Sequence, residues 1–186
     1  MSTIVLFHSA LGLRPAVHRF ADALRADGHV VHTPDLFDGE VFDRLEDGVA
    51  KRDALGIPAL MGRAAQAVAE LPADVVYAGF SMGAASAEWL AATRPGARGA
   101  ILMHAALPLA AMGVASWPEG VPVQVHATEG DPWVDAGVLA ELEAGGFEVH
   151  RYPGEGHLFA DEDAPEHDPQ SAVRLLAEVR RFLSAS

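Results

Sequence analysis

Six short apolar runs recur along the chain and are separated mostly by stretches with helical character. They cover Thr3 to Phe7, Val30 to Thr33, Asp74 to Gly79, Ala100 to His104, Val121 to Ala127 and Phe147 to Tyr152. Strands that alternate with helices are joined by βαβ crossovers, which make the strands parallel. The pattern therefore predicts an α/β fold with a doubly wound, mostly parallel six-stranded sheet in the order 2-1-3-4-5-6. We expect residues 1–186 to form a single domain, because a chain of this length can bury roughly 70% of its unfolded surface.

The helical stretches carry their own boundary signals. Pro15 opens a stretch with apolar residues at helical spacing, and Gly28 follows its end. Asp168 and Pro169 cap and open the last helix in a similar way. The span from Phe37 to Gly62 is the least regular part of the sequence, and we expect a loop there with one short helix.

The charge balance excludes some classes of partner. The net charge is -13 and the chain has a single lysine, so we expect no nucleic-acid partner, because phosphate binding needs clustered Lys and Arg. The acidic excess predicts a solubilising surface. The densest acidic stretch, Asp161 to Asp168, lacks the ligand spacing of a calcium loop. We therefore expect no metal and no cofactor.

The sequence offers no segment for a membrane. Its longest apolar stretches fall below the roughly 18 residues that a span needs, and the opening run Thr3 to Phe7 is too short for a signal sequence. We expect a soluble, cytoplasmic protein, monomeric or homodimeric. The absence of cysteine fits a reducing compartment, although it also suits an exported protein without disulfides.

A G-x-S-x-G motif, Gly79 to Gly83, lies between the third apolar run and an alanine-rich stretch. A serine at the centre of such a strand-to-helix turn projects its hydroxyl above the sheet, where a histidine can reach it. Glycines suit the flanking positions because strand and helix backbones pass close together there. Ser81 is therefore the candidate nucleophile, although it could also be a turn serine in a scaffold without catalytic function.

A candidate acid and a candidate base follow the later strands. Asp131 lies on the loop after the fifth apolar run, and His157 lies on the loop after the sixth. The chain order Ser81, Asp131, His157 is that of the α/β-hydrolase triad and differs from the orders of the chymotrypsin and subtilisin types. Asp131 could instead cap a helix, and Asp135 is an alternative acid.

Two backbone NH groups are candidates for an oxyanion hole. Met82 begins the helix after the nucleophile, where the helix dipole adds partial positive charge. We expect the second donor to be Ala10, on the loop after the first strand, and we expect the preceding His8 to be structural rather than catalytic. In the predicted strand order the winding reverses between strands 1 and 3, so both donors lie at the switch point where ligands bind.

Four segments carry a resemblance to a known family. They are Pro34 to Phe37, Gly79 to Gly83, Thr128 to Val134 and Tyr152 to Phe159. Together they resemble the dienelactone hydrolases, which are compact, lidless members of the α/β-hydrolase superfamily. The resemblance implies hydrolysis of an ester or lactone, with Ser81 as nucleophile, Asp131 and His157 as its partners, and Ala10 and Met82 as oxyanion donors.

Three positions depart from the pattern of the enzymes that open dienelactones. Those enzymes usually have cysteine where this chain has Ser81, glutamate where it has Ser9, and arginine where it has Asp161. A carboxylate at Asp161, near the mouth of a cleft, would repel an anionic substrate. We therefore expect small neutral esters or lactones.

Residues on the carboxyl-end loops predict an open, shallow, apolar site. The expected substrate contacts are Leu11, Phe37, Trp117, Trp133 and Phe159. Two alternatives stay open. The same triad would serve a thioesterase or a perhydrolase, because only the leaving group or acceptor changes, and a non-catalytic binding protein could retain the scaffold.

Overall fold

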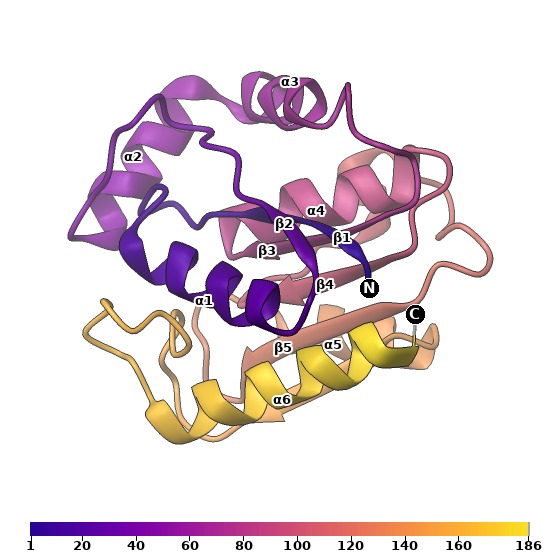
Figure 1. The fold of residues 1–186 in the computed structure, drawn as a ribbon. Coiled ribbons are helices and arrows are strands. Elements are labelled where there is room, and N and C mark those ends of the chain that lie inside the picture. The colour runs from indigo at the N-terminus through magenta and orange to yellow at the C-terminus, as the bar shows by residue number, and fades with distance from the viewer. Residues whose placement is uncertain (186) are drawn as a thin grey trace.

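The computed structural model describes residues 1–185 and contains a six-stranded, all-parallel sheet (Figure 1). The strands are β1 (Thr3–Phe7), β2 (Val30–His32), β3 (Val75–Phe80), β4 (Gly99–Met103), β5 (Val123–Thr128) and β6 (Glu148–Tyr152). Their order is β2-β1-β3-β4-β5-β6, and every neighbouring pair is parallel. The predicted fold class and strand order are confirmed.

Helices cover both faces of this sheet (Figure 1). They are α1 (Pro15–Ala26), α2 (Leu45–Leu55), α3 (Ile57–Ala67), α4 (Met82–Thr93), α5 (Ala136–Ala144) and α6 (Pro169–Ala185), with a short 3₁₀ helix, η1, at Leu109–Met112. One apolar core lies between the sheet and α1 with α6, and a second lies on the opposite face under α3, α4 and α5. Burial on both faces explains why the central strands read as continuous apolar runs: every residue of β3, β4 and β5 is buried.

The segment between residues 37 and 62 is more regular than the sequence indicates. It contains α2 and the start of α3, which meet at Gly56 with a φ of 80°. The prediction of a single short helix is wrong for a physical reason. Gly48 is the only fully buried residue of α2, so this helix lacks the apolar stripe by which a helix is recognised in a sequence.

The ends of the strands set the position of the site. The carboxyl ends of β1 and β3 are adjacent, with Phe7 paired to Gly79. The chain leaves β1 towards α1 on one face and leaves β3 into α4 on the other, so a crevice forms at this switch point. Among residues 1–185, no helix is both long enough and apolar enough to cross a membrane.

Candidate active site

Ser81 occupies the sharp turn between β3 and α4. Its backbone has a φ of 51° and a ψ of -111°, a conformation that costs a residue with a β-carbon energy. A β-carbon at Gly79 would overlap the backbone of Gly83, and one at Gly83 would overlap the carbonyl oxygens of Phe7 and His8. The two glycines therefore allow α4 to start directly against the ends of β3 and β1.

Three side chains form a hydrogen-bonded series at the carboxyl ends of the strands. Ser81 Oγ lies 2.7 Å from His157 Nε2, and His157 Nδ1 lies 2.7 Å from Asp131 Oδ2. The remaining oxygen, Asp131 Oδ1, accepts the Trp133 NH at 2.8 Å. Because a carboxylate can only accept, the histidine carries its proton on Nδ1, and Nε2 is free to accept the serine proton. Asp131 and His157 are both buried, so the hydrogen bond between them is shielded from water.

The alternative acid has a different partner. Asp135 Oδ1 accepts the NH groups of Gly137 and Val138 and caps α5. Asp131, in contrast, turns one oxygen to the histidine and one to the loop backbone. Of the two carboxylates, the structure brings Asp131 alone to the histidine.

Two rings lie close to the His157 ring. Trp133 lies 5.8 Å from it and His104 lies 6.2 Å from it, measured between ring centroids. His104 is fully buried against Phe80 and Phe159, and neither of its ring nitrogens has a partner among residues 1–185. Burial lowers the pKa of His104 well below its ordinary value, so the ring is neutral and acts as packing.

The two candidate oxyanion donors approach from opposite sides of the switch point. Met82 is the first residue of α4, where the helix has no carbonyl to receive its NH. The Ala10 NH makes no hydrogen bond within the described part of the chain, whereas its neighbour Leu11 donates to Ser9 Oγ at 3.1 Å. Ala10 therefore offers a free donor beside Leu11 and Gly12, whose NH groups both bind to Ser9.

The His8 side chain fixes this loop through two backbone contacts. Its Nδ1 lies 2.7 Å from the Ser9 carbonyl, and its Nε2 accepts the Leu36 NH at 2.9 Å. The ring is completely buried, and burial lowers its pKa, which keeps it neutral. Asp35 lies 3.5 Å from Nε2, but that nitrogen already accepts from Leu36, so the contact is not a charged pair. Both imidazole nitrogens contact backbone groups, and this is the structural role expected for His8.

The sequence profile of the dienelactone hydrolase family matches residues 1–186. The chain belongs to this family. Membership supports an α/β-hydrolase activity, and the fold agrees with it. No curated protein sequence matches the chain.

Solved structures of other hydrolases share the fold at low sequence identity. A dienelactone hydrolase-like promiscuous phosphotriesterase from metagenomic libraries has a TM-score of 0.78 and 22% identity, over 100% of this chain and 86% of that one. Dienelactone hydrolase from Anabaena variabilis has a TM-score of 0.69 and 20% identity, over 99% and 86%. The thioesterase domain from the curacin biosynthetic pathway has a TM-score of 0.66 and 15% identity, over 96% and 90%. At these identities the likeness shows the fold alone.

In this dienelactone hydrolase family member, a cleft of about 220 Å³ opens beside the serine. Its wall is mostly apolar and comes from α2, α3, α4 and the loops after β4, β5 and β6. The lining residues are Arg52, Ile57, Leu60, Met61, Ser81, Met82, Ala85, Ala105, Leu107, Trp133 and His157. Among the five expected substrate contacts, only Trp133 lies in this wall.

The other four expected contacts lie elsewhere. Leu11, Phe37 and Phe159 are at most 2% exposed and fill the core beneath the loops. Trp117 packs against Phe147 and donates its ring NH to the Val121 carbonyl, next to the amino end of β5 and away from the serine. These four predictions are wrong because a sequence places an aromatic residue on a loop but does not show whether its ring turns inwards.

Asp161 also lies outside the cleft wall. It is 8% exposed, accepts the Asp163 NH at 2.9 Å, and lines a small cavity with Ser9 and Phe80. Burial raises the pKa of its carboxyl group. The expectation that Asp161 faces an incoming substrate is wrong, because its carboxylate lies outside the cleft wall and gives no preference for neutral substrates.

Sequence reasoning missed the wall that α2 and α3 supply. Arg52 is the one charged side chain in the cleft lining that the structure describes, and it pairs with Asp53 at 2.8 Å. Ile57 and Met61 lie on the first turns of α3. The available signal was the apolar spacing of Ile57, Leu60 and Met61, which fell in the segment that we expected to be irregular.

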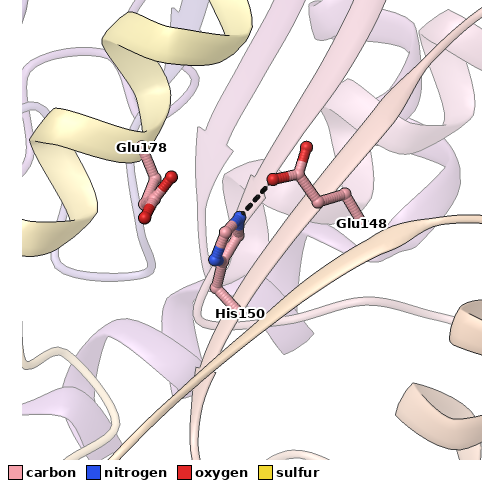
Figure 2. Close-up of side chains that lie close together, drawn as sticks. All are labelled: Glu148, His150 and Glu178. Atoms are coloured by element: carbon pink, nitrogen blue, oxygen red, sulfur yellow. Dashed lines mark hydrogen bonds and ion pairs between the residues drawn. The ribbon is translucent and has the colours of Figure 1, made fainter.

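Outside the cleft, one cluster of side chains has the composition of a metal site. Ligand atoms of Glu148, His150 and Glu178 lie within 4.8 Å of one another, between β6 and α6 (Figure 2). His150 Nε2 lies 2.7 Å from Glu148 Oε1, and Arg181 forms ion pairs with both glutamates. The guanidinium already compensates the two carboxylates, so a cation would have to displace it. The contacts describe an ion-pair network that fixes α6 to the sheet.

Proposed function

We propose that the chain is a serine hydrolase that cleaves small carboxylic esters or lactones through an acyl-enzyme on Ser81. The observation that carries the proposal is the unbroken series from Ser81 Oγ through His157 to Asp131, with 2.7 Å at each step. It is the arrangement that activates a serine hydroxyl in acyl transfer. Family membership supports the reaction class.

In the acylation step, Ser81 Oγ attacks the carbonyl carbon while His157 Nε2 takes the serine proton. Asp131 stabilises the imidazolium through the bond to Nδ1. The carbonyl oxygen becomes an oxyanion and accepts hydrogen bonds from the NH groups of Met82 and Ala10. When the tetrahedral intermediate collapses, the bond to the leaving alkoxy group breaks, and His157 returns the proton to that group.

Deacylation repeats these steps with water. His157 Nε2 takes a proton from a water molecule, whose oxygen attacks the acyl carbon. The second intermediate collapses, the bond to Ser81 Oγ breaks, and the serine regains its proton from His157. The acid product then leaves the cleft.

The cleft supports a small and largely apolar acyl group. Ile57, Met61, Ala85 and Leu107 face it together with Trp133, which is half exposed at its edge. Its volume of about 220 Å³ lies below the range of about 300 Å³ upwards that suits drug-sized ligands. Short acyl chains therefore fit better than long lipids.

A fluorophosphonate probe tests the proposed nucleophile. We expect covalent labelling of the wild-type protein at Ser81 and none of Ser81→Ala. Iodoacetamide should leave activity unchanged, because the chain has no cysteine. Labelling of Ser81→Ala at the wild-type rate would contradict the proposal, and an unlabelled but folded wild type would favour a binding protein.

A substrate panel then separates the acyl-transfer enzymes. We expect p-nitrophenyl esters of short acids and small lactones to be hydrolysed faster, in kcat/KM, than long-chain esters. Thioesters with the same acyl groups belong in the panel because the triad would act on them too. A thioester with the highest kcat/KM would reassign the enzyme to the thioesterases.

A further inference from the structure

Glu88 is a buried acid on α4, beyond the nucleophile on the same helix. Its side chain has no exposure, and it is the only titratable residue between Met82 and Thr93. Its Oε2 accepts the Leu107 NH at 2.9 Å, while Oε1 has no partner in the part of the chain that the structure describes. A fully buried glutamate with one hydrogen bond is costly to ionise.

No neighbouring charge compensates this carboxyl group. The elements packed against α4 are β1, β3, β4 and α3, and their only titratable side chains are Tyr77 and Arg63. The Tyr77 hydroxyl accepts from Arg94 at the end of α4, and Arg63 is paired with Asp38. Burial alone accounts for the raised pKa of Glu88, which lies at about 8.

The segment after β4 contains two further titratable groups, and neither pairs with Glu88. His104 packs on the opposite core, between Phe80 and Phe159, and is neutral. Glu119 is exposed near the end of the segment. Glu88 therefore carries its proton at neutral pH, as an uncharged carboxylic acid.

This acid supports one wall of the cleft. Ala105 and Leu107, on the segment between β4 and η1, line the cleft beside Ser81. Ala85, one turn before Glu88 on α4, lines it as well. The hydrogen bond from the Leu107 NH to Glu88 joins the two sides of this wall.

We propose that Glu88 is a positioning residue, which as a neutral acid fixes the wall at Ala105 and Leu107 and on losing its proton releases that wall, weakening substrate binding. The proposal rests on the proposed function for its effect on substrate. An ionised Glu88 needs water, and the adjacent cleft is a source of it once Leu107 moves away. The released form lacks one side of the cleft, so binding should decline with the fraction of enzyme that keeps the proton.

The kinetic test compares wild type with Glu88→Gln across pH 7 to 9.5, using a neutral p-nitrophenyl ester. Glutamine keeps the shape and an oxygen for the Leu107 NH but cannot ionise. In the wild type we expect KM to rise about tenfold at pH 9, with little change in kcat. In Glu88→Gln, KM should stay within about twofold over the range. Glu119→Gln, the same change at an exposed site on the same segment, should behave as wild type.

Two kinetic results would overturn the proposal. One is a wild-type KM that does not change between pH 7 and 9.5, which needs no variant to fold. The other is an equal rise in KM for wild type and Glu88→Gln.

Hydrogen exchange tests the wall without any turnover. We expect peptides that cover residues 104–112 to exchange faster in wild type at pH 9 than at pH 7, beyond the general base-catalysed increase measured on β3. The excess should vanish in Glu88→Gln. If no ester is hydrolysed but this excess is present, the proposed function fails and the role of Glu88 in holding the wall stands. Equal exchange in both proteins at pH 9 would refute that role.

Discussion

At the level of single residues, the site depends on which oxygen of which acid faces the histidine. Asp131 and Asp135 lie on the same loop, and both accept backbone NH groups, yet only Asp131 turns an oxygen to His157. The sequence favours Asp131, with Asp135 as the alternative, and the direction of the two side chains decides between them. Their roles differ because the loop directs their side chains differently.

Replacing each acid by its amide separates these roles. Asp131→Asn should leave the fold intact and reduce kcat on the order of 10⁴-fold, because an amide favours the wrong histidine tautomer. Asp135→Asn should leave kcat unchanged, because asparagine caps a helix as well as aspartate does. Steady-state kinetics on one ester would measure both, and the reverse result would show that Asp135 orients the base.

Arg52 is the residue expected to respond to substrate charge. It lines the cleft but is partly exposed and paired with Asp53, so its attraction for a carboxylate is modest. Arg52→Gln should lower kcat/KM for an anionic ester about twofold to fivefold relative to its neutral analogue, and less at high salt. Arg44→Gln is the control, because Arg44 is more exposed and lies outside the cleft wall. Equal ratios in all three proteins would remove Arg52 from substrate recognition.

At the level of elements, α2 packs against the loop that carries Ala10. Gly48 lies so close to Ala10 that a β-carbon there would overlap the Ala10 carbonyl oxygen. Although α2 lacks an apolar stripe, it packs closely against the Ala10 loop, and this contact requires that Gly48 has no side chain. Sequence analysis detects apolar periodicity and does not detect contacts of this kind.

Gly48→Ala should therefore reduce activity although alanine favours helices. The methyl group must displace α2 or the Ala10 loop, so we expect kcat to fall at least tenfold with a smaller change in KM. Gly62→Ala, on α3, meets nothing within 4 Å and should stabilise the protein by about 1 kcal/mol without loss of activity. Unchanged kcat in Gly48→Ala would show that Ala10 is not an oxyanion donor or that the loop adapts.

The burial of Glu88 in α4 predicts a pH-dependent stability. The unfolded chain releases this proton near the ordinary pKa of 4.5, whereas the folded protein releases it near 8. Between these values the folded state holds the extra proton, so its stability falls as pH rises and levels off above 8. The free energy of unfolding of wild type should therefore fall relative to that of Glu88→Gln as the pH rises from 4.5 to 8. The difference between the two proteins should change by up to about 5 kcal/mol over this range.

Urea denaturation of both proteins at several pH values measures this gain. Glu119→Gln, at an exposed position, should show no such trend. A constant difference between wild type and Glu88→Gln from pH 5 to 8 would mean that Glu88 is hydrated in the folded protein.

At the level of the whole molecule, the site is assembled from distant parts of the chain. Ala10, Ser81, Asp131 and His157 follow β1, β3, β5 and β6, and a parallel sheet brings all these strand ends to one edge. This is why the sequence could predict that the loops of Ser81, Asp131 and His157 lie together: strand order alone brings these loops to one edge. The cleft wall was harder to predict, because α2 lacks apolar periodicity and the sequence does not show where α3 packs.

The backbone at Ser81 sets function against stability. In an ordinary helical or extended site, glycine is less stable than alanine by about 1 kcal/mol, because it loses more freedom on folding. At position 81 glycine should instead be more stable than alanine, because a φ of 51° with a ψ of -111° is strained for any residue with a β-carbon. Ser81→Gly should unfold a few degrees above Ser81→Ala in thermal melts, and the opposite order would mean that the turn is relaxed. Glycine, which has no side chain to attack a substrate, would then relieve the strain that Ser81 bears, so selection for melting temperature alone would remove the proposed nucleophile.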